Sequence, residues 1–186
     1  MKHPASRDYF DYWDRQRGVD AAPDRTRIEP NAVRHVLADS FVLAYETGYP
    51  FRAAGTRLCA LFGAELTDTP FLELWDVKSR KAISDLVADA ALQMRPTVAG
   101  VAAANDTGFL NLELLLLPFA PRPHMPRRLT GVLAPLTPPV PGHHLIRALI
   151  LTSWRDLDAA PVRPRSIRRR NLGSGFTVYE GRDHNA

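Results

Sequence analysis

The 186-residue sequence has little cysteine, little lysine and no long apolar run. Cys59 is the single cysteine, which excludes an internal disulfide and any zinc site built from several cysteines. The leucine run Leu114–Leu117 is far shorter than the roughly 20 residues of a membrane helix. No apolar stretch near Met1 indicates a signal peptide. These absences favour a soluble cytoplasmic protein that does not insert into a membrane.

The charge is divided unevenly along the chain. Residues 161–186 contain six arginines and two acids, whereas the first 160 residues are neutral, so the whole net charge of +4 lies in the tail. A neutral body does not indicate a nucleic-acid-binding surface. The tail arginines could bind an acidic protein, a nucleic acid or an anionic lipid by charge. No aromatic residue lies among them, and a solvated tail is the plainer interpretation. The arginines of this cluster are Arg163, Arg165, Arg168, Arg169 and Arg170.

The first part of the sequence predicts an amphipathic helix followed by a hairpin. Residues Ser6–Arg17 place aromatic side chains at helical spacing beside a charged face. One helix cannot bury these rings alone, so they must pack on the body or on a second chain. A short helix is expected after Pro30. Phe41–Glu46 and Tyr49–Ala53 predict two antiparallel strands.

The middle of the sequence predicts two helices and then a region rich in strands. Thr56 is the expected N-cap of a short helix that ends at Gly63. Asp76 is the expected N-cap of a longer helix that ends before Pro96. The apolar face of that helix consists of Ile83, Leu86, Val87, Ala90 and Met94. Strands are predicted over residues 97–103, 109–118 and 128–136, with extended structure favoured over 144–155 and a short strand at 176–179.

This order of elements predicts an α+β fold, a five-stranded antiparallel sheet with helices on one face. Residues 1–29 are expected to form the N-terminal helix and a linker. Residues 30–141 are expected to form the core. Residues 142–186 are expected to form a C-terminal extension with an Arg-rich linker.

Several segments carry a family resemblance: Tyr49–Gly63, Phe71–Trp75, Leu112–Pro118, Leu129–Leu136 and Val178–Gly181. Together they resemble the PAS domain, and in particular short bacterial proteins that consist of one divergent PAS domain. The resemblance implies a sensory or protein-interaction module that, in many cases, binds a small ligand between sheet and helices and dimerises through flanking helices. It implies no enzymatic activity.

The residues do not favour a cofactor, a metal or a catalytic site. Haem-binding PAS domains generally use a histidine on the long helix, and residues 76–94 contain none. Cys59 lacks the sequence context of a flavin photosensor and is expected to be a core residue, with a redox cysteine as the sharper alternative. The adjacent His143 and His144 would point to opposite faces of a strand, so they cannot readily share one metal. No nucleotide-binding or hydrolase motif is present, so the sequence predicts no enzyme.

The resemblance places a candidate ligand pocket between the inner face of the sheet and the helices. A dry, filled core is favoured over a ligand cavity at this place. Small residues on one strand keep the ligand alternative open, because they leave room for a ligand or for a neighbouring helix; they are Ala99, Gly100, Ala102 and Ala103. No cofactor is predicted, and an unidentified small ligand is the alternative. The candidate pocket residues are Phe62, Trp75, Ile83, Val87, Leu112 and Leu114.

The N-terminal aromatic residues Tyr9, Phe10 and Trp13 have two interpretations. They could cover their own sheet at Leu115 and Leu117, or they could form an isologous contact with a second protomer. If the second holds, disrupting Trp13 should change assembly and leave the fold intact.

The sequence thus predicts a non-enzymatic PAS signalling protein that acts through protein–protein interaction with itself, as a homodimer, and with signalling proteins. A small-molecule sensor is the alternative. A nucleic-acid-associated regulator that acts through the arginine tail is the weaker alternative.

Overall fold

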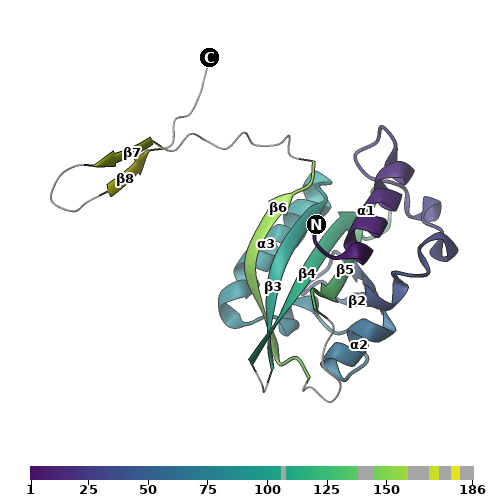
Figure 1. The fold of residues 1–186 in the computed structure, drawn as a ribbon. Coiled ribbons are helices and arrows are strands. Elements are labelled where there is room, and N and C mark those ends of the chain that lie inside the picture. Colours follow the sequence, from purple (N-terminus) through teal and green to yellow (C-terminus); the bar gives the residue numbers. More distant parts are fainter. Residues whose placement is uncertain (106–107, 138–144, 159–167, 172–176, 181–186) are drawn as a thin grey trace.

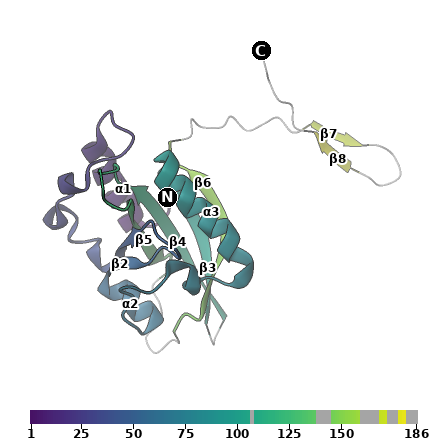
Figure 2. The same cartoon turned by 180° about the vertical axis from the view of Figure 1, so that it is seen from behind.

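The chain folds into an antiparallel sheet with one longer helix on each face (Figures 1 and 2). The computed structural model describes residues 1–105, 108–137, 145–158, 168–171 and 177–180. None of the described helices is long and apolar enough to cross a lipid bilayer. The helices are α1 (Pro4–Arg17), α2 (Thr56–Phe62) and α3 (Val77–Gln93), and the strands are β1 (Ser40–Ala44), β2 (Phe51–Ala54), β3 (Thr97–Asn105), β4 (Gly108–Pro118), β5 (Arg128–Pro135), β6 (Ala148–Asp156), β7 (Arg168–Asn171) and β8 (Thr177–Glu180).

The main sheet confirms the predicted α+β fold and orders its strands β2-β1-β5-β4-β3-β6. Every neighbouring pair is antiparallel. β3 and β4 form a long hairpin, and β5 then inserts between β4 and β1. The pairing of β5 with β4 requires a glycine at position 131, because a Cβ atom on Gly131 would overlap the carbonyl oxygen of Leu115.

The sheet has one strand more than the sequence predicts. β6 pairs with β3 and forms an edge of the sheet. Its residues fit helical and strand spacing alike, so extended structure was expected there but no place in the sheet. The sheet therefore continues past residue 141, the expected end of the core, while the domain boundaries themselves remain a prediction. β7 and β8 pair with each other in a separate two-stranded sheet.

The inner face of the sheet is covered by α3 (Figure 2). The predicted N-cap is confirmed, since the Asp76 carboxylate accepts hydrogen bonds from the backbone N–H groups of Lys78 and Ser79. The prediction for Met94 is wrong. This residue ends the helix with a left-handed backbone (φ 55°) and packs on the opposite side of the sheet. The other predicted apolar residues of the helix are buried as expected: Ile83, Leu86, Val87 and Ala90.

The outer face of the sheet is covered by α1 and by residues 18–39 (Figure 1). The helix expected after Pro30 is a single 3-10 turn, one of three in that segment. The two faces of the sheet thus carry two separate apolar clusters. The buried outer cluster consists of Ala5, Tyr9, Trp13, Ala22, Val33, Val36, Leu115, Leu117, Val132 and Ala134.

Candidate functional site

The predicted pocket between α3 and the sheet is occupied by side chains. Trp75, Ile83, Val87, Leu112 and Leu114 all belong to the inner cluster, and none is more than 1% exposed. Phe62 lies at the margin of this cluster and is only partly buried. The structure therefore brings five of the six predicted residues together as a packed core.

One polar group in this interior has no partner. The indole Nε1 of Trp75 is buried, and no described residue accepts its hydrogen bond. The ring packs edge-on against Phe71, with centroids 5.6 Å apart, and Phe71 in turn contacts Phe41 and Phe51. An unpaired buried donor of this kind costs about 1–3 kcal/mol. The inner face is thus almost wholly apolar, with a single unused donor.

The four small residues of β3 do not lie on one face of the sheet, so they do not together line a cavity beside α3. Ala99 and Ala103 face the inner cluster and are buried. Gly100 and Ala102 lie on the other face, because side chains alternate along a strand. A Cβ atom at Gly100 would lie 2.8 Å from the hydroxyl oxygens of Thr152 and Ser153. The glycine therefore leaves room for the bulge where β6 pairs with β3.

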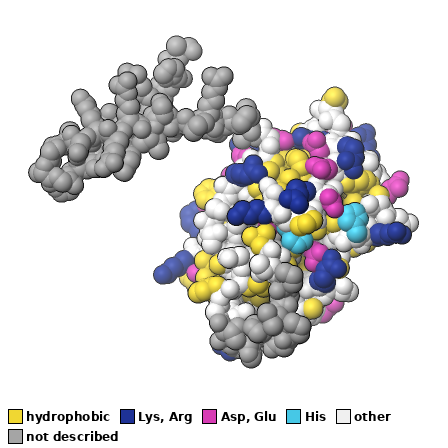
Figure 3. Space-filling model, in the orientation of Figure 1, with side chains coloured by type: hydrophobic (Ala, Val, Ile, Leu, Met, Phe, Trp, Pro, Cys, Tyr) yellow, Lys and Arg dark blue, Asp and Glu magenta, His cyan; other side chains and the backbone are white. Residues whose placement is uncertain are grey.

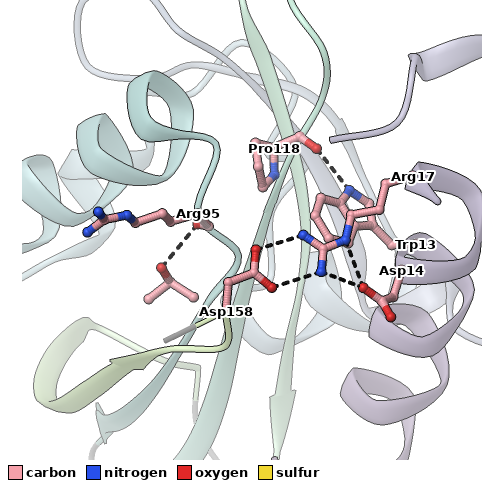
Figure 4. Close-up of polar contacts among 7 residues, drawn as sticks. Trp13, Asp14, Arg17, Arg95, Pro118 and Asp158 are labelled. Atoms are coloured by element: carbon pink, nitrogen blue, oxygen red, sulfur yellow. Dashed lines mark hydrogen bonds and ion pairs between the residues drawn. The ribbon is translucent and has the colours of Figure 1, made fainter. Parts of the chain in front are cut away.

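The predicted aromatic residues of α1 pack on their own sheet. Tyr9 and Trp13 are buried with Leu115 and Leu117, the first of the two arrangements expected from the sequence. Phe10 is partly buried and stacks on Trp13 at 6.2 Å. The indole Nε1 of Trp13 donates to the carbonyl oxygen of Pro118 at 2.8 Å (Figure 4). Tyr9 and Trp13 are thus buried against their own sheet, whereas Phe10 keeps part of its surface exposed.

Arg17 ties the end of α1 to the chain that leaves β6 (Figure 4). Its guanidinium donates to both carboxylate oxygens of Asp158, at 2.7 and 2.8 Å, and to Asp14 at 2.7 Å. It also lies 4.9 Å above the ring of Trp13. The hydrogen bond to Asp158 raises the pKa of Arg17. Sequence spacing indicates the Asp14 pair, but no sequence signal indicates Asp158, which is 141 residues away.

Glu113 holds the start of α1. It is only 5% exposed, and its carboxylate accepts the backbone N–H groups of Lys2 at 2.6 Å and His3 at 3.0 Å. Both carboxylate oxygens are thus used, which offsets the cost of burying the charge. The helix is tied to the sheet at both of its ends by polar contacts.

A hollow of about 440 Å³ lies beside α1 on the outer face, and we call it the outer hollow. Its floor includes Val42 of β1, Ala53 of β2 and Thr130 of β5. Tyr9 of α1 and Ile28 of the 18–39 segment contribute to its walls. The volume lies in the range of small-molecule sites, roughly 300–1,000 Å³. No sequence pattern indicates it, because its lining comes from segments far apart in the chain.

The polar groups of the outer hollow have defined hydrogen bonds. The Thr130 hydroxyl donates to the carbonyl oxygen of Phe41 at 2.9 Å, so the Tyr9 hydroxyl donates to Thr130, at 2.8 Å. Burial raises the pKa of Tyr9 to about 12. At its mouth lie Arg25 and Arg122, and Arg122 is paired with Asp24. This pairing holds the pKa of Asp24 far below its usual range.

Reactive side chains are dispersed over the described residues. No three His, Cys, Asp or Glu side chains there could hold one metal ion. Cys59 is half-buried, and its Sγ lies 3.8 Å from a carboxylate oxygen of Glu65. His143 and His144 fall outside the described residues. The predictions that the chain has no cofactor, metal or catalytic site remain predictions.

Two of the five arginines of the tail cluster fall outside the described part of the chain. Arg163 and Arg165 are not described. Arg168, Arg169 and Arg170 belong to β7, where they pair with β8. The described residues do not show what these arginines bind, so a binding role for the tail remains a prediction.

Comparison with known protein families places the chain in one of them. The family model described as "PAS domain" matches residues 1–134, from the start of the chain to the last but one residue of β5. The match includes α1 and ends before β6. A search of curated proteins finds no significant match.

Proposed function

Because the chain belongs to the PAS domain family, whose members serve signalling and sensory roles, we propose that it is a non-enzymatic regulatory module that acts through protein–protein interaction, as a homodimer. The proposal rests chiefly on one observation, the open outer half of strand β6. A filled interior supports it further, since the space of the predicted ligand pocket holds packed side chains.

The edge of β6 is covered over half its length. The carbonyl oxygen of Leu149 accepts the backbone N–H of Asp76, and the N–H of Leu151 donates to the Ser79 hydroxyl. Residues 152–155 are exposed, and no described segment pairs along their outer side. Trp154, at the centre of this stretch, is 61% exposed. A strand edge with free backbone groups is a template for pairing with another strand.

A second copy of the chain is the simplest partner for this edge, because it offers the same free strand. Two copies of one strand can pair antiparallel about a two-fold axis, which gives a closed, isologous contact. Centred on Trp154, this pairing would place two indole rings against each other, and aromatic anchors are favoured at the centre of interfaces. In this arrangement the two sheets join along β6, and α1 stays on its own sheet.

The experiment is light scattering of the purified protein over a range of concentrations. We expect a dimer for the natural sequence and a monomer for Trp154→Glu, which places charge at the centre of the pairing. The matched control is Phe109→Glu, because Phe109 is a comparably exposed aromatic residue (71%) on the neighbouring hairpin. A monomeric natural protein, or equal loss of dimer in both variants, would contradict the proposal.

A small-molecule sensor is the second candidate, and Trp75 is the observation that favours it. Its buried Nε1 donor lacks an acceptor, and a ligand oxygen that reached it would recover the cost of the unpaired group. Native mass spectrometry separates the two candidates. A discrete extra mass that Trp75→Phe removes would favour the sensor, whereas an unliganded dimer would favour the interaction module.

A further inference from the structure

The outer hollow combines an apolar lining with unpaired positive charge, on the face of the sheet opposite α3. Val42, Ala53 and Ile28 supply apolar surface, and Phe119 adds an aromatic ring. Arg25 lies at the mouth and forms no ion pair or side-chain hydrogen bond with any described residue. In Figure 3, Arg and Lys side chains lie among hydrophobic ones on this face of the molecule.

A second arginine, Arg128, lies near Arg25, with the carboxylate of Glu46 as a nearby opposite charge. A smaller hollow of about 30 Å³ shares Arg25, Phe119 and Arg122 with the outer hollow and is also lined by Arg128. Burial lowers the pKa of Arg128, and the nearby charge of Arg25 lowers it further. Arg128 forms no ion pair within the described residues. Arg25 and Arg128 line this smaller hollow together, next to the outer hollow, and an anion between them would stabilise both charges.

The hydrogen bonds inside the hollow determine which end of an amphipathic anion would lie inside it. Because the Tyr9 hydroxyl donates to Thr130, its oxygen presents lone pairs rather than a donor to the hollow. The raised pKa keeps this hydroxyl neutral at physiological pH. A negative group would therefore find no donor there, whereas guanidinium donors stand at the mouth. The apolar part of a ligand fits inside, and its charged end fits at the mouth.

We propose that the outer hollow binds a small amphipathic anion, with an apolar chain against Val42 and Ala53 and a carboxylate or phosphate headgroup held by Arg25 and Arg128. Arginine suits this role, because its planar fork of donors matches both headgroups. The site lies on β1, β2 and β5, at the other end of the sheet from β6. It goes beyond the proposed function and stands without it, since dimer formation through β6 does not involve these residues.

The test is calorimetric titration of the full-length protein with decanoate, decyl phosphate and decanol. Decanoate and decyl phosphate should bind more tightly than decanol, because only they carry a headgroup charge. Arg25→Gln and Arg128→Gln should each weaken decanoate binding about tenfold and leave decanol binding nearly unchanged. Arg34→Gln is the matched control, since this arginine lies in the same 18–39 segment and does not line the hollow. Circular dichroism confirms that each variant is folded.

A blocking variant tests the location. Ala53 is exposed on β2 with its side chain on the floor of the hollow, so Ala53→Trp should fill the hollow without disturbing the core and abolish binding of all three probes. Full binding to Ala53→Trp, no binding of decanoate, or equal affinity for decanoate and decanol would each overturn the proposal. Sedimentation with phosphatidylglycerol vesicles separates the sources of the headgroup. Binding to vesicles without binding to decanoate would assign the arginines to a membrane surface and overturn the site.

Discussion

The two faces of the sheet are built by different means. The inner face packs α3 through apolar side chains and through hydrogen bonds along the helix, from the Leu151 N–H to the Ser79 hydroxyl and from the Tyr49 hydroxyl to the Ser84 carbonyl oxygen. Its interior also holds the unpaired indole donor of Trp75. The outer face packs α1 through apolar side chains and also through specific polar contacts at Glu113, Trp13 and Arg17. Apolar contact fixes a helix on a sheet without fixing its position closely, whereas directional hydrogen bonds specify one position. Both helices are therefore fixed in one position, α3 by hydrogen bonds along its length and α1 chiefly by polar contacts at its two ends.

The largest loss of stability is expected for a substitution of Trp13, on the outer face. Trp13→Ala should lower the free energy of unfolding by about 3–5 kcal/mol, because it removes a fully buried ring and leaves the Pro118 carbonyl oxygen without its donor. This revises the expectation that the substitution would leave the fold intact. Urea unfolding measures the change. A loss below about 1 kcal/mol would mean that α1 is not part of the core.

The next effect concerns Tyr9 and high pH. The pKa of Tyr9 is raised to about 12 in the folded chain, against about 10 in an unfolded chain. The neutral hydroxyl thus contributes stability that is complete below pH 10 and is lost as the pH rises toward 12. This loss should amount to about 3 kcal/mol and be absent in Tyr9→Phe. Unfolding of both proteins between pH 8 and 12 checks this, and a constant stability difference across that range would contradict it.

A smaller effect compares the two buried indoles directly. Trp13→Phe and Trp75→Phe remove similar ring surface from the two faces, but the first also removes a hydrogen bond whereas the second removes an unpaired donor. Trp13→Phe should therefore be more destabilising by about 1–3 kcal/mol. Paired denaturant curves measure the difference. An equal loss of unfolding free energy in the two variants would show that the hydrogen bond of Trp13 adds no stability over the unpaired donor of Trp75.

The smallest effect concerns the contact between Arg17 and Asp158. Asp158→Asn should lower stability by less than about 1 kcal/mol, because the pair is partly exposed. It should instead increase hydrogen exchange at the C-terminal end of α1, and exchange in α3 should stay unchanged. Asp85→Asn is the control, because it breaks an exposed ion pair with Lys81 on α3 itself. Faster exchange throughout the sheet would contradict a local role for Asp158.

The inner face was predictable from the sequence, since its signals are local. Asp76 precedes an apolar face with helical spacing, and alternating leucines mark β4, so helix, cap and strand were correctly predicted. Five of the six candidate pocket residues lie in the inner cluster, but sequence spacing cannot distinguish a cavity from a filled core. The prediction that Met94 lies on the apolar face of the helix was wrong, because the helix ends at this residue, and sequence spacing does not fix the position of a helix end to one residue.

The outer face depends on contacts that local patterns do not carry. The partners of Glu113 lie more than 100 residues away in the chain, and β6 joins the sheet next to β3 across a long connection. The outer hollow likewise draws its lining from α1, the 18–39 segment and three strands. No periodicity or motif relates such residues to one another, and an apolar helix face alone does not show whether it covers its own sheet or a second copy.

The contact between Arg17 and Asp158 is weak enough to be broken in a sizeable fraction of folded molecules. A surface pair worth at most about 1 kcal/mol is broken in about one molecule in six or more at 25 °C. The Arg17–Asp158 contact thus opens and closes, while Arg17 keeps its contacts with Asp14 and the ring of Trp13. A partner that binds Asp158 in the released state needs little free energy to shift this balance. The contact between α1 and the chain that leaves β6 can therefore open without any change in the buried contacts of the helix.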